Sequence, residues 1–274
     1  MNKEHFFIRK IKRNHYIGDD GAVLPDGLIA SMDAFFEEVH FRRSWMSLDQ
    51  IAAKAMLVNI SDQIVMNARP RYALLSVAMP SLSHEEILLL QRGFHRVAKQ
   101  FNIAIVGGDT IQNHKLDLSI TILGESEAPL LRTGLKRGDL IVYTGKLGSV
   151  KRDLEKLLNG GTISPRSRFI LPRLRPAFVY TAAPLMRVAM DISDGLFSDL
   201  ERLSELNHCG FAFDKPIPEY IGCSGEEYEV LFGCAPENLP AIRKIAKQTR
   251  TPLTVVGRVI AGRFTNPCKA HHFA

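Results

Sequence analysis

The apolar residues of this chain are most concentrated in one stretch, residues 52–66, which is hydrophobic on nearly every side. A helix with this pattern has no polar face, so we expect it to lie buried between other elements. Asn59, Ser61 and Asp62 interrupt its second half, and Asn59 and Asp62 share one helix face because they are three residues apart. A buried carboxylate is costly unless a cation or hydrogen-bond donors meet it. The stretch therefore predicts a buried helix whose Asp62 needs a partner.

Shorter apolar patterns predict the remaining elements. Two capping boxes, Ser47 with Gln50 and Ser83 with Glu86, predict helix starts, and the second helix is amphipathic to about residue 101. Further helices are predicted before 159, within 166–187, at 195–206 and at 237–249. Strands are predicted at 28–33, 72–79, 103–106, 116–123, 140–144 and 253–256.

Strands and helices alternate irregularly, with no clean parallel repeat, which predicts an α+β fold or a mixed α/β fold. Proline, glycine and basic residues gather at 126–138. We therefore predict two domains, an N-terminal domain of residues 1–128 and a C-terminal domain of residues 129–274.

Composition narrows the class of protein. The chain has 274 residues, of which 46% are hydrophobic and 23% charged, as is normal for a soluble globular protein. No run approaches the length of a membrane span and the first residues show no secretory pattern, so we expect a cytoplasmic protein without a membrane partner. The cysteines, which show no C-x-x-C spacing, predict neither zinc nor disulfides and are expected to be buried thiols: Cys209, Cys223, Cys234 and Cys268.

The net charge of +6 is unevenly distributed. Residues 132–175 hold eleven Lys/Arg against three Asp/Glu. This segment is compatible with a nucleic-acid surface or with a site for a small polyanion such as a nucleotide. Only Tyr143 and Phe169 are aromatic there, which argues against a platform for single-stranded nucleic acid. We expect no nucleic-acid partner.

Aspartates follow the ends of five apolar runs, each after a small residue or glycine. One such residue alone is typical of a turn or a helix N-cap. If several converge, their charges repel unless cations neutralise them, and oxygen ligands without His or Cys suit Mg²⁺. No Walker A or G-x-G-x-x-G pattern is present, so we expect ATP to be held through metal-bridging acids and not by a P-loop. The acids are Asp20, Asp33, Asp62, Asp109 and the pair Asp191 and Asp194.

Seven short motifs occur in an order that resembles the thiamine-monophosphate kinase family, in the superfamily of aminoimidazole ribonucleotide synthetase. The resemblance implies a two-domain α+β protein that is a homodimer through its N-terminal domains. It also implies direct transfer of the γ-phosphoryl group of ATP to thiamine monophosphate, with several Mg²⁺ ions. The motifs are Gly18-Asp-Asp20, Asn59-x-Ser-Asp62, Gly107-Gly-Asp-Thr110, Leu131-Arg-Thr-Gly134, Thr144-Gly-x-Leu-Gly148, Asp191-Ile-Ser-Asp-Gly-Leu196 and Ser224-Gly-Glu-x-Tyr-Glu229.

The same resemblance implies roles for individual residues. The metal positions are Asp20, Ser31, Asp33, Asp62, Asp109, Asp191 and Asp194. The ATP-contacting positions are Gly108, Asp109, Arg132 and Ser193, and the catalytic set is Asp62, Asp109, Arg132 and Asp191. The acceptor substrate is expected at His40, Glu226 and Phe273. Two positions depart from the family: Met32 replaces a threonine, and Ala270 replaces an aromatic residue expected against the substrate.

Alternative hypotheses follow from the same residues. A catalytically impaired nucleotide-binding regulator would fit the changes at Met32 and Ala270, and a sister ATP-dependent enzyme would share the fold. No cysteine precedes Cys209, which argues against a selenophosphate synthetase, and Cys268 is not the last residue, unlike that of the hydrogenase-maturation relative. The Ser224–Glu229 motif favours the thiamine enzyme. Without the resemblance, Arg132 reads as a surface arginine, His40 as an ordinary core or turn histidine and Glu226 as a solvated acid.

Overall fold

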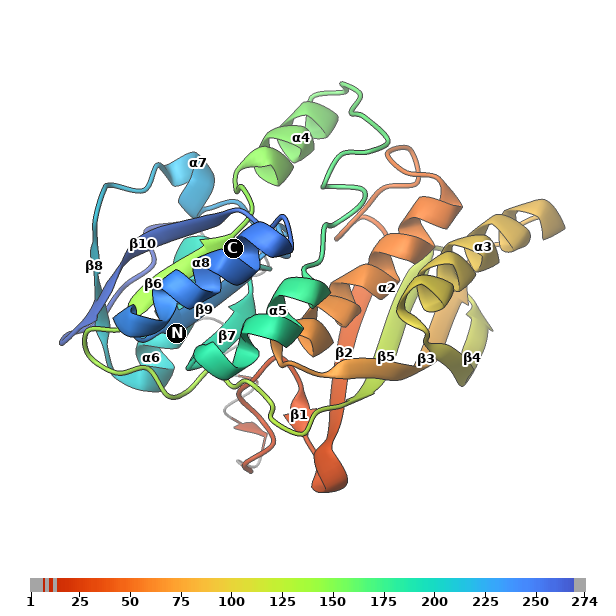
Figure 1. The fold of residues 1–274 in the computed structure, drawn as a ribbon. Helices are drawn as coiled ribbons and strands as arrows, with labels where there is room; N and C mark the ends of the chain where they lie inside the picture. The colour runs from red at the N-terminus through yellow and green to blue at the C-terminus, as the bar shows by residue number, and fades with distance from the viewer. Residues whose placement is uncertain (1–6, 8–9, 12–13, 269–274) are drawn as a thin grey trace.

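The structure is a computed structural model that describes residues 7, 10, 11 and 14–268. Its strands form two five-stranded sheets, one from each half of the chain (Figure 1). The first has the order β1-β2-β5-β3-β4: β1 (Ala22–Val23), β2 (Leu28–Phe36), β3 (Arg69–Met79), β4 (Ala104–Gln112) and β5 (Asp117–Glu125). The second has the order β7-β9-β6-β10-β8: β6 (Leu140–Thr144), β7 (Val188–Asp191), β8 (Gly210–Phe213), β9 (Val230–Cys234) and β10 (Leu253–Ile260). The predicted α+β class is confirmed.

Two helices begin where the sequence predicts them. Both predicted capping boxes are present, and the helices that follow them begin at Leu48 and His84. The helix bounds are α2 (Leu48–Val65), α3 (His84–Phe101), α4 (Ser149–Leu158), α5 (Pro176–Ala182), α6 (Leu196–Asn207), α7 (Glu219–Gly222) and α8 (Leu239–Gln248).

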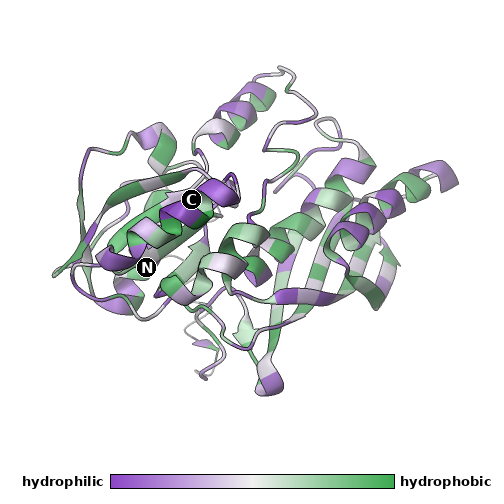
Figure 2. Cartoon of the chain, viewed as in Figure 1, coloured by the Kyte–Doolittle hydropathy of each residue, from purple (hydrophilic) through white to green (hydrophobic). Residues whose placement is uncertain are grey.

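Helix α2 is the buried helix that the apolar stretch predicts. It lies between the first sheet, α3 and α5 (Figure 1). Ile51, Met56 and Ile60 are fully buried in a core that extends into both halves of the chain. By contrast, α3 is hydrophilic along its outer side (Figure 2). Because α2 touches both halves, polar residues in its second half lie where the halves meet.

Within the part of the chain that the structure describes, helices cover only one face of the first sheet. Strands β3 and β4 are parallel, and the other neighbours are antiparallel. Helices α2 and α3 cover one face, toward which Ile29, Phe35 and Ile120 point. The opposite face is left exposed with large apolar side chains: Met32, Phe36, Tyr72, Leu74, Val106 and Ile111.

The second sheet is antiparallel and covered on both faces. Alternate residues of its central strands enter two different clusters. Val142 and Phe232 pack with α5 and α8, whereas Tyr143 and Leu231 pack with α6. The sheet thus fixes Asp191, which ends β7, against a rigid support. Among the described residues, no helix has the length and apolarity that crossing a membrane requires.

Three details correct the sequence predictions. The strand expected at 103–106 continues through Gly107-Gly108-Asp109-Thr110 to Gln112, paired with β3. A side chain at Gly108 would meet Leu75 O at 1.8 Å, so only glycine permits this pairing. The sequence pattern does not predict strands β7, β8 and β9. Cys223 and Cys268 form a disulfide across a separation of 45 residues, whereas Cys209 and Cys234 are buried free thiols as expected.

Candidate functional site

Three aspartates converge between the two halves of the molecule. Carboxylate oxygens of Asp20, Asp62 and Asp191 all lie within 4.8 Å of one another. Asp20 lies in the turn before β1, Asp62 belongs to α2 and Asp191 ends β7. Elements from distant parts of the chain therefore build one acidic cluster, and its donors are oxygen atoms. Oxygen donors of this kind suit Mg²⁺ better than zinc or copper.

Burial, and to a lesser extent neighbouring carboxylates, raise the pKa values of Asp33, Asp62 and Asp191. Burial raises the pKa of Asp62 well above its usual range, and the charges of Asp33 and Asp191 raise it further. Burial also raises the pKa of Asp191 to about 8, with a further contribution from Asp20 and an opposing one from Ser61. Asp33 forms a side-chain hydrogen bond with Asp62, yet burial raises its pKa to about 6. The cluster thus holds more negative charge than its surroundings compensate, as a cation site does before the ion binds.

Arg132 supplies part of the compensation from inside the protein. Its side chain is only 8% exposed and forms an ion pair with Asp20, to which both Nη2 and Nε donate. Its backbone N–H donates to Asp19 Oδ1 at 2.6 Å. The interpretation of Arg132 as a surface arginine is therefore wrong. The residue holds the turn of Asp20 against the second half of the chain.

Ser31 lies beneath the cluster in a network that fastens α2 to the first sheet. Its Oγ donates to Asn59 Oδ1 at 2.5 Å and accepts from Gln63 Nε2 at 2.9 Å. Asn59 Nδ2 in turn donates to Ile120 O. These bonds use the polar residues of α2 to fix its rotation, and Asp62 lines the cavity together with Asp33 of β2, with which it forms a side-chain hydrogen bond.

Asp109 and Gly108 are not brought to the cluster within one chain. Gly108 is aligned with Asp33 across β5 and β3. Because neighbouring strands are about 4.8 Å apart, these two residues are separated by roughly 14 Å. Asp109 is the next residue along β4, pairs with the exposed Ser76 and so lies on the open face. Its predicted metal and ATP contacts remain predictions that one chain alone does not satisfy.

Met32 lies on the same open face. It is paired with Thr121, which pairs in turn with Leu74, and its side chain is 66% exposed. The three clustered acids lie on the other side of the sheet. Replacement of the family's threonine by Met32 therefore leaves the cluster of Asp20, Asp62 and Asp191 unchanged.

A cavity of about 460 Å³ opens beside the acidic cluster. Its walls include the acids Asp62 and Asp191, together with Ser193, His40 and Glu226. Two adjoining cavities, of about 490 and 250 Å³, also have His40 and Glu226 in their walls. Their remaining walls include apolar side chains: Val39, Trp45, Leu154, Leu158 and Phe169. The structure thus joins an acidic chamber to a partly apolar one, with His40 and Glu226 at the junction.

His40 has a fixed orientation at this junction. Its Nδ1 accepts a hydrogen bond from the backbone N–H of Phe36 at 3.0 Å, and its ring stacks on Phe35 with centroids 5.6 Å apart. In the neutral ring the proton is then on Nε2. His40 is a turn histidine, as one hypothesis states, but it also borders all three cavities. Asp194 and Ser193 line two of the same cavities.

Two residues near this junction were not assigned from the sequence. Lys54 is completely buried in α2, and its Nζ lies 2.8 Å from Glu226 Oε2. Tyr228 lines the acidic chamber. The sequence does indicate that Lys54 is unusual. Like Asp62, it is a charged residue in an apolar helix and therefore needs a partner of opposite charge. Tyr228 is a fixed position of the Ser224–Glu229 motif, which assigns it no role. Phe273 and Ala270 lie outside the described residues.

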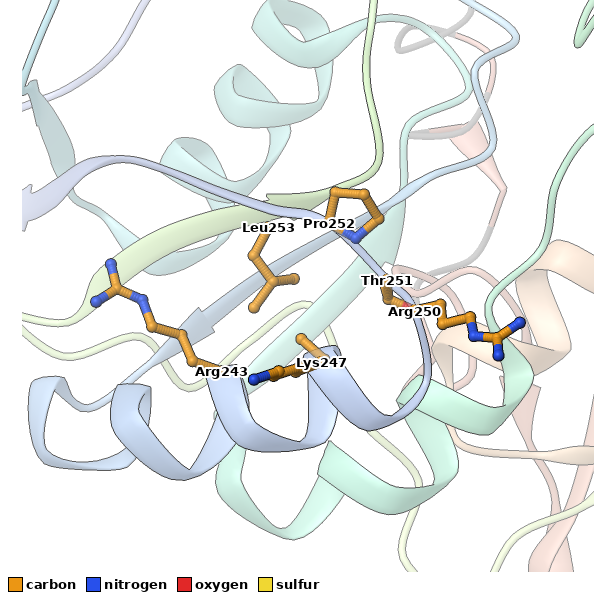
Figure 3. Close-up of a pocket in the computed structure, with 7 residues that line it drawn as sticks. Arg243, Lys247, Arg250, Thr251, Pro252 and Leu253 are labelled. Atoms are coloured by element: carbon orange, nitrogen blue, oxygen red, sulfur yellow. The ribbon is translucent and has the colours of Figure 1, made fainter.

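Basic residues of the 132–175 segment are partly used inside the protein. Arg175 lies 2.7 Å and Arg168 3.0 Å from Glu229, whose side chain is fully buried. With Arg132, these arginines stabilise internal carboxylates and do not form a continuous outer surface. A separate basic cavity of about 420 Å³ lies at α8. There the guanidinium groups of Arg243 and Arg250 point to opposite sides, so they do not converge on one ligand (Figure 3).

Comparison with known proteins places this geometry in a family. Residues 18–126 match the family model described as AIR synthase related protein, N-terminal domain. The thiamine-monophosphate kinase of Rhodopirellula baltica is 31% identical over 275 residues, covering 89% of this chain and 83% of that protein. A solved structure described as AaThiL complexed with AMPPCP and TMP has 27% identity and a TM-score of 0.85, covering 95% of this chain and 91% of its own. That of thiamine monophosphate kinase from Aquifex aeolicus has 25% identity and a TM-score of 0.84, covering 96% of both chains.

Proposed function

The chain belongs to the thiamine-monophosphate kinase family, and from this premise we propose that it transfers the γ-phosphoryl group of ATP to thiamine monophosphate. A phosphate oxygen of thiamine monophosphate forms the new bond to the γ-phosphorus as the bond to the bridging oxygen breaks, which yields thiamine diphosphate and ADP. The observation that carries the proposal is the cluster of Asp20, Asp62 and Asp191 beside the cavity of His40 and Glu226. An adenine nucleotide analogue and TMP bind together in the similar structure.

Mg²⁺ fits the acidic cluster. The three carboxylates offer only oxygen ligands. Burial and neighbouring acids raise the pKa values of Asp62 and Asp191, and the charge of Arg132 opposes this in part. We assign magnesium to Asp20, Asp62 and Asp191, with Asp33 and Asp194 at the edge of the same acidic region. When bound, the ions supply positive charge to the transferring phosphate oxygens.

The residues of the chain position the reactants. Phosphoryl transfer depends on placement and on charge neutralisation more than on a strong base, and a phosphate acceptor is already ionised at neutral pH. Ser193, which lines the acidic chamber, is suited to donate a hydrogen bond to a phosphate oxygen. Arg132, which forms an ion pair with Asp20, is suited to orient that carboxylate. The buried floor formed by α2 excludes water from that side of the cluster.

The acceptor is assigned to the adjoining cavities. His40 and Glu226 provide polar groups there, and Val39, Leu154 and Leu158 provide apolar walls for a flat ring system. With its phosphate toward Asp62 and its rings toward α4, thiamine monophosphate would have polar groups at the junction and apolar groups beyond it. Phe273, outside the described residues, stays a proposed contact.

A homodimer would give the open face of the first sheet a partner. That face carries six exposed apolar side chains, and exposed apolar patches of this kind are typical of interaction surfaces. Asp109 lies on it, so a second copy would come close to Gly108 and Asp109. We therefore propose dimerisation through the N-terminal domain, residues 1–128, with the C-terminal domain, residues 129–274, completing each site.

A coupled assay tests the proposal. Purified protein is incubated with ATP and thiamine monophosphate, with and without Mg²⁺, and both ADP and thiamine diphosphate are measured. We expect equal amounts of the two products, dependence on Mg²⁺ and no turnover of the precursor of aminoimidazole ribonucleotide. Binding of ATP without formation of thiamine diphosphate would instead support a nucleotide-binding regulator.

A further inference from the structure

Lys54 and Glu226 form an ion pair across the two halves of the protein. Lys54 Nζ donates to Glu226 Oε2 at 2.8 Å, although the residues are 172 positions apart. The lysine side chain is fully buried, whereas that of Glu226 is 24% exposed. Of the two side chains, that of Glu226 therefore reaches the cavities, and Lys54 influences a ligand there through its contact with Glu226.

The environment of Lys54 leaves its ammonium little freedom. Nζ lies 4.0 Å from the centroid of the Phe169 ring and 5.5 Å from that of Phe35. Both rings are buried, and aromatic faces attract cations. The ammonium is thus held between two rings with its hydrogen bond directed at Glu226. A buried pair of this type is costly to form and strongly destabilising to break.

The backbone of Glu226 is also restrained. Its φ is +55°, an uncommon value for a residue with a side chain, and its N–H donates to Ser193 O at 2.6 Å. Strained backbone held by its surroundings is frequent at functional sites. Both ends of Glu226 are therefore fixed, the backbone by Ser193 and Oε2 by Lys54.

We propose that Lys54 is a positioning residue for the acceptor, which fixes Glu226 so that its second oxygen, Oε1, accepts a hydrogen bond from an uncharged N–H group of the substrate. The inference rests on the proposed function, in which Glu226 contacts thiamine monophosphate. Because Lys54 compensates the glutamate charge, Glu226 is a weak counter-ion for a cation but remains a good hydrogen-bond acceptor.

Thiamine monophosphate offers both kinds of group. Its thiazolium ring carries a positive charge, and its pyrimidine ring carries an exocyclic amino group. The pairing with Lys54 selects the amino group as the partner of Glu226. An acceptor with an oxo group at that position would place an oxygen against Oε1, and a site built to accept a hydrogen bond discriminates strongly against such a replacement.

Selectivity between two acceptors tests the inference. The values of kcat and KM are measured for thiamine monophosphate and for oxythiamine monophosphate, in which oxo replaces amino. The proteins compared are wild type, Lys54→Met, Glu226→Gln and the double variant. Lys99→Met, at an exposed position on α3, is the matched control. We expect wild type and the control to prefer the amino compound, and Glu226→Gln to reduce this preference by roughly tenfold or more.

Lys54→Met should reduce the same preference, mainly through KM of the amino compound, and the double variant should match Glu226→Gln. That non-additivity would show that Lys54 acts through Glu226. Lys54→Met leaves the Glu226 carboxylate unpaired and can fail to fold. In that case the double variant, which has no unpaired carboxylate, is compared with the single variant Glu226→Gln. A wild-type preference in Lys54→Met, or additive losses in the double variant, would overturn the inference. Failure of the wild type to phosphorylate thiamine monophosphate would instead overturn the proposed function.

Discussion

Ser61 Oγ donates a hydrogen bond of 2.7 Å to Asp191 Oδ2. The bond joins α2, which packs on the first sheet, to the last residue of β7 in the second sheet. Both residues are buried. One hydroxyl thus links the two halves at the acidic cluster, and it also lowers the pKa of Asp191 against the larger effect of burial, which raises it to about 8.

Replacement of this hydroxyl should therefore weaken metal binding. In Ser61→Ala the pKa of Asp191 should rise further, because a donor to its charged form is lost. Residues that support metal ligands typically contribute about 10- to 100-fold to metal affinity, and we expect a loss in that range. Titration of turnover with Mg²⁺ at pH 7 and at pH 8.5 measures it. The loss should be smaller at the higher pH, and an unchanged Mg²⁺ dependence would contradict the role.

Asp62→Asn should abolish turnover and raise the stability of the metal-free protein. The variant removes one of several carboxylates that repel one another. Burial and the neighbouring acids raise the pKa of Asp62. Functional clusters of this kind are retained although they destabilise the fold. Without metal, Asp62→Asn should thus unfold at a higher Tm than wild type. Added Mg²⁺ should increase the Tm of Asp62→Asn less than it increases that of wild type.

The matched control for Asp62→Asn is Asp26→Asn. Asp26 is exposed in a turn with φ of +61°, a conformation that asparagine tolerates well. It should change neither turnover nor the response to Mg²⁺. Near-normal turnover of Asp62→Asn would remove this residue from the metal site, and failure to fold even with Mg²⁺ and ATP would make its role structural.

The acids of the cluster also predict how stability depends on pH. Burial raises the pKa of Asp191 to about 8 and that of Asp33 to about 6 from a value of 3.8. The folded state therefore binds more protons than the unfolded state in this range. The free energy of unfolding of the metal-free protein should decrease between about pH 5 and about pH 8.

Mg²⁺ should reverse this trend. The ion binds the ionised carboxylates, so the increase in Tm that it produces should grow as pH rises from 6 to 8.5. Thermal unfolding with excess chelator or with Mg²⁺ over this range measures both effects. An increase in Tm that does not depend on pH would show that the ion binds elsewhere.

The sequence predicts those site residues whose charge is costly to bury, because such a charge needs a partner. Asp62 interrupts an apolar helix and therefore needs a partner, and the structure places it beside Asp20 and Asp191. The same reasoning applied to Lys54 would have predicted a buried anion as its partner. That partner could not have been named, since Glu226 lies 172 residues further along the chain and no periodicity connects the two.

Other features depend on register and sheet order, which local patterns do not determine. Asp109 follows an apolar run as the other acids do, but the order β2-β5-β3-β4 separates it from them and places it on the opposite face. The pairing of Cys223 with Cys268 likewise arises from tertiary packing around Phe264, which contacts Phe197, Phe211 and Phe213.

This disulfide should stabilise the second half of the protein. It closes a loop of 45 residues beside the segment of Glu226. A loop of that length predicts about 4 kcal/mol of stabilisation in the chain-entropy model. Cys268→Ser, or wild type with reductant, should therefore unfold at a lower Tm, and reductant should not lower the Tm of Cys268→Ser further. Cys209→Ser, which changes a free thiol, is the control, and an equal effect of reductant on wild type and Cys268→Ser would contradict the assignment.

The open face of the first sheet predicts the oligomeric state. Leu74 lies within this face and is 39% exposed, so Leu74→Arg should convert a dimer to monomers by placing charges at the interface. Sedimentation velocity at several concentrations measures the change. Ile260→Arg is the matched control, because Ile260 is similarly exposed but belongs to the second sheet. Since Asp109 shares the face with Leu74, monomers of Leu74→Arg should also lose turnover while keeping a folded acidic cluster, whose response of Tm to Mg²⁺ should be retained. A dimer that persists in Leu74→Arg, or full turnover by its monomers, would show that this face does not complete the site.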